Sequence, residues 1–521
     1  MSIVVLALCA TIVALLYYLS VKNFSYWKNK NVPHLKPLPL LGNYSEYILM
    51  KKYIGHVSQD MCRQFPKEPY FGAFYGTEPT LVIQDPEIIK LVFTKDFYYF
   101  HSRENSKYTT KEVTTQNLFF NHGDTWKVVR QNLTPLFSSA KMKNMFYLIE
   151  KCGHSLEKLA DEERAISEVV EVKSLMSRYT MDCIGSCVFG IDTKTMEKSS
   201  EVNPFVEMGD IIFQTSRFMG YMLVFRAIWP KIFYGLGLKY FPKDIDNFFK
   251  SLMLGVFERR DHKPTSRHDF VDLVLALKQN SHIIGDSLNP KSAGNKKIEV
   301  EVTDDLLVAQ CIVFFGAGYE TSASTLACAL YELAKNQEAQ RRAQEEVDEY
   351  LCRRNNKLVY ECVTELPYIE ACLNETMRLY PVLPVLTREV VEDYTFPSGL
   401  QVDKGVRVHL PVYHLHRHPE YFPEPDAFRP DRFYGAAKED IKPYTFFPFG
   451  EGPRQCIGLR FSKMQTTAGL ITILKKYRVE LADGTPTKLD FYPTTFLTNT
   501  RNALNLKFIP REEWQQRVFA R

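Results

Sequence analysis

A chain of 521 residues, with 45% hydrophobic and 13% aromatic residues, is long and apolar enough to bury a large core, which excludes an intrinsically disordered protein. Its 65 basic and 61 acidic residues leave a formal charge of +4, too near balance to indicate a nucleic-acid-binding protein. The eleven cysteines are an odd number and lack Cys-x-x-Cys zinc spacing, so a reducing compartment is favoured over a disulfide framework.

The chain begins with an uncharged apolar run, Ile3 to Leu19, of about the minimum length for a membrane-spanning helix. Lysines follow this run, so the positive-inside rule predicts a single-pass anchor with the rest of the chain in the cytoplasm. A cleaved signal peptide is the alternative, but no small-residue cleavage site follows. We therefore expect residues 1–21 to be a transmembrane anchor in membrane lipid.

Residues 22–42 contain a cluster of prolines, which restrict φ and stiffen the exit from the membrane, so this segment is predicted to be a hinge. Residues 43–521 are predicted to form the main domain. Within it, Phe71–Tyr75 and Thr80–Ile83 are typical of a hairpin that begins a small β-rich lobe. Gly285–Lys297 is polar and aperiodic, which predicts a loop.

Trp126 and Arg130 lie four residues apart and share one face of a predicted helix. Such a pair is commonly ordinary packing with a surface ion pair. Between Phe205 and Phe249 the chain mixes aromatic, apolar and basic residues, which favours a second contact with the membrane interface. Amphipathic core helices are the alternative explanation of this segment.

A helical pattern without proline runs from Thr303 to about Lys335, roughly 50 Å at 1.5 Å per residue. Its centre, Ala317 to Thr321, places a glycine, an acid and a hydroxyl within little more than one turn. The glycine weakens the helix, and burying Glu320 is costly unless it has a partner. The segment is therefore either a site that uses these groups or a place of close helix packing in which Thr321 bonds back to a carbonyl.

Glu375 and Arg378 lie three residues apart on one face of another predicted helix, followed later by Arg432. Glu-x-x-Arg occurs by chance in many helices. This pair is informative because it stands between the long helix and the segment described next.

The segment Phe449–Gly458 reads Phe-Gly-Glu-Gly-Pro-Arg-Gln-Cys-Ile-Gly. Its glycines and proline predict a tight loop that carries Cys456 to a helix N-terminus, where a thiolate is favoured. A single axial thiolate suits haem iron, and Arg454 could reach a haem propionate. A buried cysteine that acts as a small hydrophobic residue is the alternative.

The pattern Phe-x-x-Gly-x-Arg-x-Cys-x-Gly, complete from Phe449 to Gly458, resembles the haem-binding loop of the cytochrome P-450 monooxygenases. Ala317 to Ser322 resembles the oxygen-activation motif of that family, and all its signatures occur in family order over essentially the entire chain. The likeness is to microsomal insect enzymes of the detoxification clan. It implies a mainly α fold with a smaller β-rich lobe (α+β), the cytochrome P-450 fold, preceded by a transmembrane helix, with residues 43–521 as the haem-thiolate catalytic domain.

The resemblance also implies a role for each matching residue. The cofactor would be haem b, iron protoporphyrin IX, with Cys456 as the axial ligand of the iron, Thr321 ordering water or O₂, and Glu320 supplying protons. The other haem-binding residues would be Arg454, Trp126, Arg130, Arg388, Phe449, Gly450, Gly458 and Ala317, and the structural network would be Glu375, Arg378 and Arg432. The substrate pocket would be lined by Phe119, Phe120, Phe314, Phe315, Gly316, Val385, Leu386 and Phe496.

The implied reaction inserts one atom of O₂ into a lipophilic small molecule with electrons from NADPH. No Gly-x-Gly-x-x-Gly fingerprint is present, so NADPH–cytochrome P-450 reductase must be a separate chain, and whether cytochrome b5 takes part is left open. The implied location is the endoplasmic reticulum membrane. Metabolism of xenobiotics, plant toxins or insecticides is the favoured role, and hydroxylation of an endogenous hormone or fatty acid is the alternative. A non-catalytic haem-binding protein is disfavoured because Glu320 and Thr321 are present.

Overall fold

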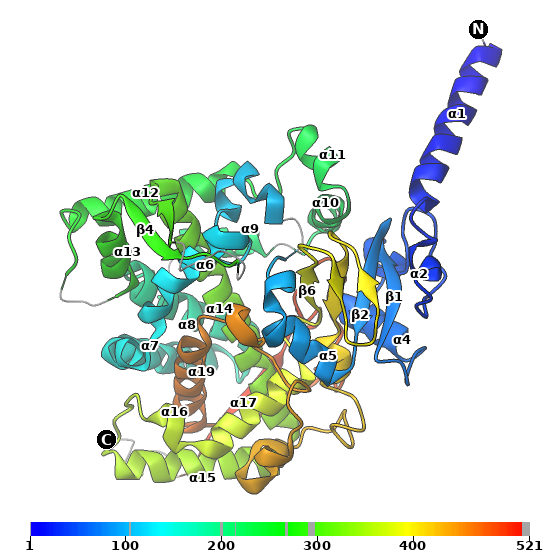
Figure 1. The fold of residues 1–521 in the computed structure, drawn as a ribbon. Helices are drawn as coiled ribbons and strands as arrows, with labels where there is room; N and C mark the ends of the chain where they lie inside the picture. The colour runs from blue at the N-terminus through cyan, green and yellow to red at the C-terminus, as the bar shows by residue number, and fades with distance from the viewer. Residues whose placement is uncertain are drawn as a thin grey trace.

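The computed structural model describes residues 2–103, 106–197, 202–213, 215–265, 269–289 and 297–512. It is mainly helical, with its largest sheet beside the helical body (Figure 1). The α-helices are α1 (Ser2–Val21), α2 (Tyr26–Asn29), α3 (Ser45–Ile48), α4 (Ile54–Cys62), α5 (Pro86–Lys90), α6 (Gly123–Leu133), α7 (Ser139–Ile166), α8 (Val172–Ile184), α9 (Pro204–Ile212), α10 (Arg217–Ile228), α11 (Pro230–Gly235), α12 (Lys243–Arg259), α13 (Phe270–Lys278), α14 (Asp304–Lys335), α15 (Gln337–Arg353), α16 (Cys362–Glu365), α17 (Pro367–Leu379), α18 (Val412–Leu415) and α19 (Leu459–Leu474). Three short 3-10 helices matter for the site: η3 (Ser106–Lys111), η4 (Val113–Thr115) and η9 (Gly452–Arg454).

The strands of the described residues form four small sheets. They are β1 (Tyr70–Tyr75), β2 (Glu78–Ile83), β3 (Val169–Glu171), β4 (His282–Asp286), β5 (Lys297–Glu301), β6 (Leu386–Glu389), β7 (Tyr394–Thr395), β8 (Gln401–Val402), β9 (Arg407–Leu410), β10 (Tyr477–Leu481) and β11 (Asn505–Pro510). The largest sheet has the order β1-β2-β9-β6, in which only the β2/β9 pair is parallel. The predicted hairpin is confirmed as β1 and β2, and the architecture is the expected mainly α fold with a smaller β-rich lobe.

The prediction of a loop at Gly285–Lys297 is wrong at both ends. Gly285 and Asp286 end β4, and Lys297 begins β5, which pairs antiparallel with β4. Residues 290–296 lie outside the described part. Cross-strand pairing gives these polar strands regular backbone hydrogen bonds that local composition does not reveal.

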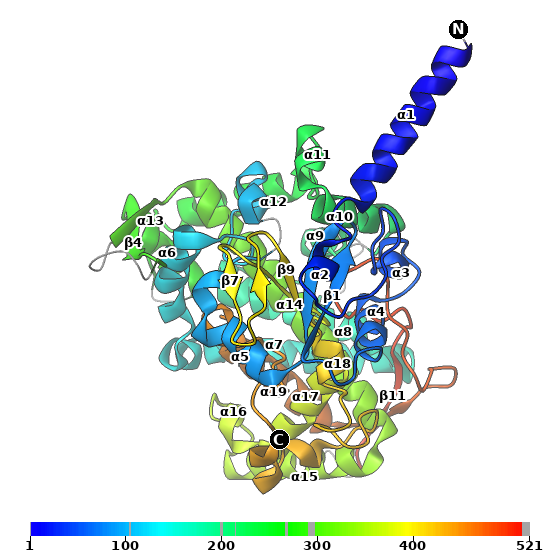
Figure 2. The ribbon, with the colours of Figure 1, turned by 45° about the vertical axis from the view of Figure 1, so that its right-hand side comes forward.

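Helix α1 stands away from the body in both views of the ribbon (Figures 1 and 2). Its segment Ile3–Val21 is only 6% buried and is long and apolar enough to cross a membrane. Helix α14 passes the same test, but it is 78% buried, as expected of a core helix. Among the described residues, α1 is therefore the candidate transmembrane span.

The predicted hinge is partly built into the folded body. Trp27 in α2 is fully buried, and its Nε1 donates to the Ala73 carbonyl at 2.9 Å. A Cβ at Gly72 would come within 2.3 Å of the Trp27 ring, so β1 can accept this ring only with glycine there. Burial of so large an aromatic side chain joins the chain from Trp27 onward to the β-rich lobe.

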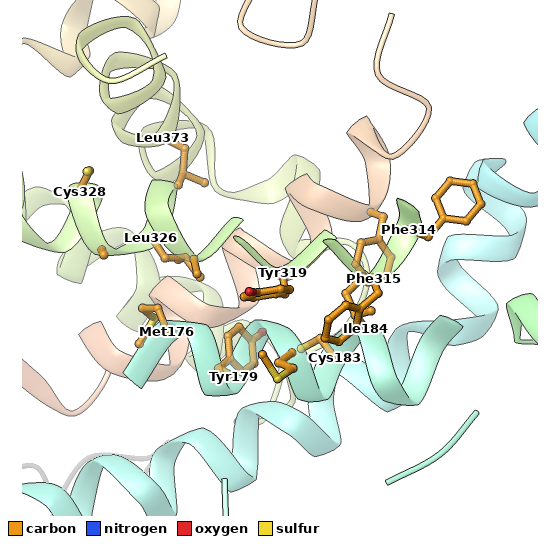
Figure 3. Packing of buried hydrophobic residues seen from close by; sticks show 14 of the residues in the cluster. Met176, Tyr179, Cys183, Ile184, Phe314, Phe315, Tyr319, Leu326, Cys328 and Leu373 are labelled. Carbon is orange, nitrogen blue, oxygen red and sulfur yellow. The ribbon is translucent and has the colours of Figure 1, made fainter. Parts of the chain in front are cut away.

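Helix α14 crosses the centre of the molecule and packs along α8. Figure 3 shows Phe315 and Tyr319 of α14 beside Ile184 and Cys183 of α8. A Cβ at Gly318 would lie only 2.1 Å from the Ile184 side chain, so close packing of the two helices accounts for this glycine. The packing alternative is thus confirmed for Gly318.

Candidate active site

The loop that carries Cys456 has a shape set by its backbone. Gly450 and Gly452 have φ of +70° and +69°, in the left-handed region that favours glycine. A Cβ at Gly452 would also lie 2.0 Å from the Phe93 carbonyl oxygen. Gly458 is the N-cap residue of α19. The loop therefore delivers Cys456 to a helix N-terminus, as predicted.

The Cys456 sulfur lies deep in the protein, and yet its side chain is accessible. Burial raises the pKa of the Cys456 thiol, and the Gly458 backbone and the cations of Arg130 and Arg103 oppose this rise without cancelling it. Burial therefore opposes the thiolate that the loop and its arginine neighbours favour. A coordinated metal ion would deprotonate the thiol outright.

A short stretch in the middle of α14 is accessible, although most of this helix is buried. Ala317 is exposed, and Thr321, one turn later, is half-buried. The hydroxyl oxygens of Ser322 and Ser462 lie 3.5 Å apart, which places this stretch beside the first turn of α19. The structure thus brings Ala317 and Thr321 to the region just beyond the Cys456 loop.

Four arginines, Arg103, Arg130, Arg388 and Arg454, surround this region. Burial lowers the pKa of each, to about 10 for Arg103 and about 9 for Arg388. Repulsion within the group adds to the shifts of Arg103, Arg388 and Arg454. No carboxylate in the described ranges forms an ion pair with any of the four. Such a group of buried cations is unfavourable unless an anionic ligand binds there.

The hydrogen bonds of Arg454 and Arg388 show which of their N–H donors already have an acceptor in the protein. Arg454 donates to the backbone carbonyls of His101, Phe119 and Asn121. Arg388 donates through Nη1 to one backbone carbonyl at 2.8 Å, and its buried Nε has no partner in the described structure. Haem carries two propionates and an iron that accepts an axial thiolate, so the residues present fit this group.

Trp126 and Arg130 lie in α6, as their spacing predicts. The Arg454 guanidinium carbon lies 4.4 Å from the centroid of the Trp126 ring, so the indole supports this cation from one side. Trp126 is thus placed against Arg454, and Arg130 lies close enough to Cys456 to oppose the rise of the thiol pKa.

Glu320 is nearly buried and has a cationic partner that its sequence context does not reveal. Its Oε1 accepts from Lys173 Nζ of α8 at 2.8 Å, and Lys173 also donates to the Ser324 hydroxyl at 2.7 Å. Thr321 Oγ1 donates to the Ala317 carbonyl at 2.6 Å, which is the back-bonded arrangement. The Thr321 oxygen keeps lone pairs that can accept a further hydrogen bond.

The network of Glu375, Arg378 and Arg432 is present. Glu375 and Arg378 are fully buried, and Arg378 donates to the two carboxylate oxygens at 2.7 and 2.9 Å. Arg432 Nε lies 3.3 Å from Glu375 Oε1. Arg378 also donates to the backbone carbonyls of His416, Pro425 and Ala427. Asp431 lies outside this network and pairs with Arg342 instead.

Several predicted pocket residues lie next to the arginine cluster or the cysteine loop. Phe119 and Phe120 are half-buried with ring centroids 5.0 Å apart. Leu386 is half-buried, and its Cδ1 lies 3.7 Å from the position of a Cβ on Gly450. Phe496 is 37% exposed.

The structure places Phe314 and Phe315 in the hydrophobic core instead of on the accessible stretch of α14. Phe315 is fully buried against rings of α9 and α12, and Phe314 packs against rings of η5 and α13, where η5 is Thr134–Phe137. The 100° step between residues turns Phe315 away from Ala317. A Cβ at Gly316 would lie 3.4 Å from the Phe213 ring, and Val385 is buried.

Sequence reasoning missed Arg103 and Lys173. Arg103 Nη1 donates to the Phe119 carbonyl at 2.6 Å, next to Arg454, although the two arginines are far apart in the chain. Lys173 belongs to α8 and meets Glu320 only because α8 packs along α14. Neither residue lies in a periodic pattern with its partner, so the sequence holds no signal for these contacts beyond their charge.

Comparison with known proteins gives a consistent result. The family described as "Cytochrome P450" matches residues 32–506. The chain is 32% identical over 508 residues to cytochrome P450 6B2 of Helicoverpa armigera, covering 97% of this chain and 98% of that protein. It is 34% identical over 515 residues to cytochrome P450 6a2 of Drosophila melanogaster, covering 97% and 99%. Cytochrome P450 6k1 of Blattella germanica is 33% identical over 510 residues, covering 97% and 96%.

Proposed function

Because this chain belongs to the cytochrome P450 family, we propose that it inserts one atom of O₂ into a lipophilic substrate and reduces the other atom to water. The observation that carries the proposal is the exposed residue Cys456 among buried arginines that have no carboxylate partner in the described ranges. The electrons would come from NADPH through NADPH–cytochrome P-450 reductase.

In this proposal Cys456 ligates the haem iron, and Arg388 and Arg454 bind the propionates. Arg103 and Arg130 add positive charge beside the thiolate and the propionates. When bound, haem supplies the iron centre at which O₂ is reduced and split. The propionates would relieve the repulsion within the arginine group, so haem binding would stabilise this region.

Glu320, Thr321 and Lys173 would deliver the protons that water formation requires. The Lys173 side chain is 26% exposed and that of Glu320 is 8% exposed, so the pair connects solvent with the interior of α14. Ser324, which accepts from Lys173, belongs to the same group. Thr321 lies one residue from Glu320 on the accessible stretch, where its oxygen can accept a hydrogen bond from an ordered water.

The side chains beside the cysteine loop favour an apolar substrate. Phe119, Phe120 and Leu386 offer apolar surface. Aromatic and aliphatic side chains of this kind line sites that bind lipophilic molecules. We propose that the lipophilic substrates are xenobiotics, as the resemblance of the sequence to enzymes of the detoxification clan implies.

The proposed location is the endoplasmic reticulum membrane, with α1 as the span and the catalytic domain in the cytoplasm. Figures 1 and 2 both show α10 and α11 at the same upper end of the molecule from which α1 projects. Large apolar side chains at this end are exposed: Phe218, Tyr221, Ile232 and Leu236. Such a surface supports a second contact with the membrane interface.

The proposal is tested by reconstituting the purified protein with a P450 reductase, NADPH and a mixed panel of lipophiles under ¹⁸O₂. We expect NADPH-dependent products that each gain one ¹⁸O atom. Products without ¹⁸O, or no turnover of any compound although the reductase reduces the haem, would contradict a monooxygenase. Turnover confined to one hormone or fatty acid would replace the xenobiotic role with an endogenous one.

A further inference from the structure

A fully buried histidine directly follows α18. His416 is the C-cap residue of this short helix. Its ring nitrogen Nε2 lies 3.1 Å from the backbone nitrogen of Phe447. A backbone amide can only donate, so Nε2 is the unprotonated nitrogen of the imidazole and accepts this hydrogen bond. His416 thereby contacts the segment that leads into the loop of Cys456.

The surroundings of His416 keep its imidazole neutral. Burial and the cation of Arg378 lower the pKa of His416 to about 3, although the Met377 backbone opposes this shift. At neutral pH the ring is therefore able to accept a hydrogen bond. The ring also packs against two aromatic side chains, with its centroid 5.1 Å from that of Phe446 and 5.6 Å from that of Phe447. These contacts hold the imidazole in its orientation.

The backbone of the same histidine belongs to the buried ion-pair network. The His416 carbonyl accepts from Arg378 Nη1 at 2.9 Å, and Arg378 donates to both carboxylate oxygens of Glu375. All three residues are fully buried. His416 therefore makes two different contacts, because its carbonyl joins the network and its imidazole joins the chain that precedes the cysteine loop.

Backbone hydrogen bonds continue from Phe447 to Cys456. The Phe447 carbonyl accepts from the Gly450 amide at 2.9 Å, which closes the turn at the start of the cysteine loop. Within this turn, the Phe449 carbonyl accepts from the amide of Cys456 itself, also at 2.9 Å. Phe447 is buried, so without His416 its amide would be a buried donor that lacks this acceptor. The place of the turn therefore depends on the imidazole.

We propose that His416 is a positioning residue, which fixes the sulfur of Cys456 relative to the haem by joining the cysteine loop to the buried ion-pair network. The inference rests on the proposed function and adds to it a residue that acts on Cys456 through one backbone amide. The backbone carbonyls to which Arg378 donates all precede the loop. The imidazole thus supplies a connection that these hydrogen bonds do not make.

Three substitutions separate the hydrogen bond of the imidazole from its bulk. His416→Gln keeps an acceptor about as far from the backbone as Nε2. His416→Asn carries the same amide group on a side chain that is too short to reach Phe447, and His416→Leu fills space without any acceptor. The carbonyl that accepts from Arg378 remains in all three. The matched control is His418→Leu, because the His418 ring packs against Tyr421, with centroids 4.8 Å apart.

The first measurement is the rate at which the reduced carbon-monoxide complex of the full-length protein loses its thiolate-type Soret band on mild warming. We expect loss to be about tenfold faster in His416→Leu and His416→Asn, as for a buried amide left without an acceptor. His416→Gln and His418→Leu should behave like the wild type. Equal rates in His416→Gln and His416→Leu would overturn the proposal, because the imidazole would then act through packing or not at all. If His416→Leu does not bind haem, the comparison of His416→Gln with His416→Asn decides.

The second measurement is amide hydrogen exchange in residues 445–458, which does not depend on haem chemistry. Exchange should be faster in His416→Leu and His416→Asn and close to that of the wild type in His416→Gln. Unchanged exchange in all three variants would also refute the proposal. A wild-type protein without a thiolate-type band would refute the proposed function, whereas the exchange data would still test the connection between His416 and the loop.

Discussion

Thr321 and Thr325 make the same hydrogen bond in the same helix, and only Thr321 lies next to the exposed Ala317. Thr321 donates to the carbonyl of Ala317 at 2.6 Å, and Thr325 donates to that of Thr321 at 2.9 Å. A purely structural role predicts similar effects for the two residues. A role in proton delivery predicts a different effect for Thr321 alone.

We expect Thr321→Ala to uncouple the reaction without stopping it. The substitution leaves Cys456 and the arginines in place, so substrate binding and reduction should proceed, but it removes the hydroxyl that we propose orders water near the site of O₂ reduction. Product formed per NADPH should fall several-fold, with hydrogen peroxide making up the difference, in a measurement of all three. Thr325→Ala is the matched control and should keep normal coupling. Equal coupling in both variants would assign Thr321 a structural role.

The residues that sequence could identify are those with a local signature. Cys456 and Arg454 stand in one glycine-rich loop, and Trp126 and Arg130 share a helical face. Arg103 and Lys173 could not be identified, because their partners come from distant segments and nothing periodic connects them. The rise of the Cys456 thiol pKa was also beyond sequence, because it depends on burial in the folded protein.

At the scale of elements, α17 carries two acidic residues that differ in burial. Glu375 has a fully buried side chain and is held by Arg378 and Arg432, whereas the Glu370 side chain is 27% exposed and pairs with Lys463 and Lys438. Removing one partner of a buried ion pair leaves an uncompensated charge, which is far more destabilising than losing an exposed pair.

We therefore expect Glu375→Ala to lower the free energy of unfolding by roughly 3–5 kcal/mol, because it leaves Arg378 buried without its carboxylate. Glu370→Ala, the control on the same helix, should cost at most about 1 kcal/mol. Urea unfolding followed by circular dichroism measures both. Similar losses for the two variants would mean that the buried network does not hold α17 as its geometry indicates.

Elements with strong periodicity are predicted to within two residues at each end, including α14 and the hairpin of β1 and β2. Pairings between distant segments are not. The parallel pairing of β2 with β9 depends on tertiary contacts that local composition does not encode. The burial of Phe314 and Phe315 could not be predicted from sequence either. Adjacent residues in a helix point in different directions, and only packing decides which face is accessible.

At the scale of the whole molecule, Trp27, which precedes the prolines of the predicted hinge, already packs into the folded body. Helix α1 makes almost no contact with the body, and the exposed side chains of α10 and α11 lie at the same end (Figure 1). Anchoring and folding of the haem site should therefore be separable.

We expect deletion of residues 2–21 to lower membrane association strongly and to leave the haem spectrum unchanged, measured by vesicle flotation and absorption. Part of the binding should remain through the exposed apolar side chains of α10 and α11, and it should fall further when Phe218, Ile232 and Leu236 are changed to serine. Loss of haem on deletion would show that α1 belongs to the folded domain.

The central claim is that Cys456 is the axial ligand of a haem held by the arginine group. The measurement that tests it most directly is the reduced carbon-monoxide difference spectrum of the wild-type protein beside Cys456→Ala, with Cys362→Ala as a control for loss of a buried thiol elsewhere. We predict a thiolate-type Soret band in the wild type and in Cys362→Ala, and its absence in Cys456→Ala. The same thiolate-type band in Cys456→Ala would contradict the assignment.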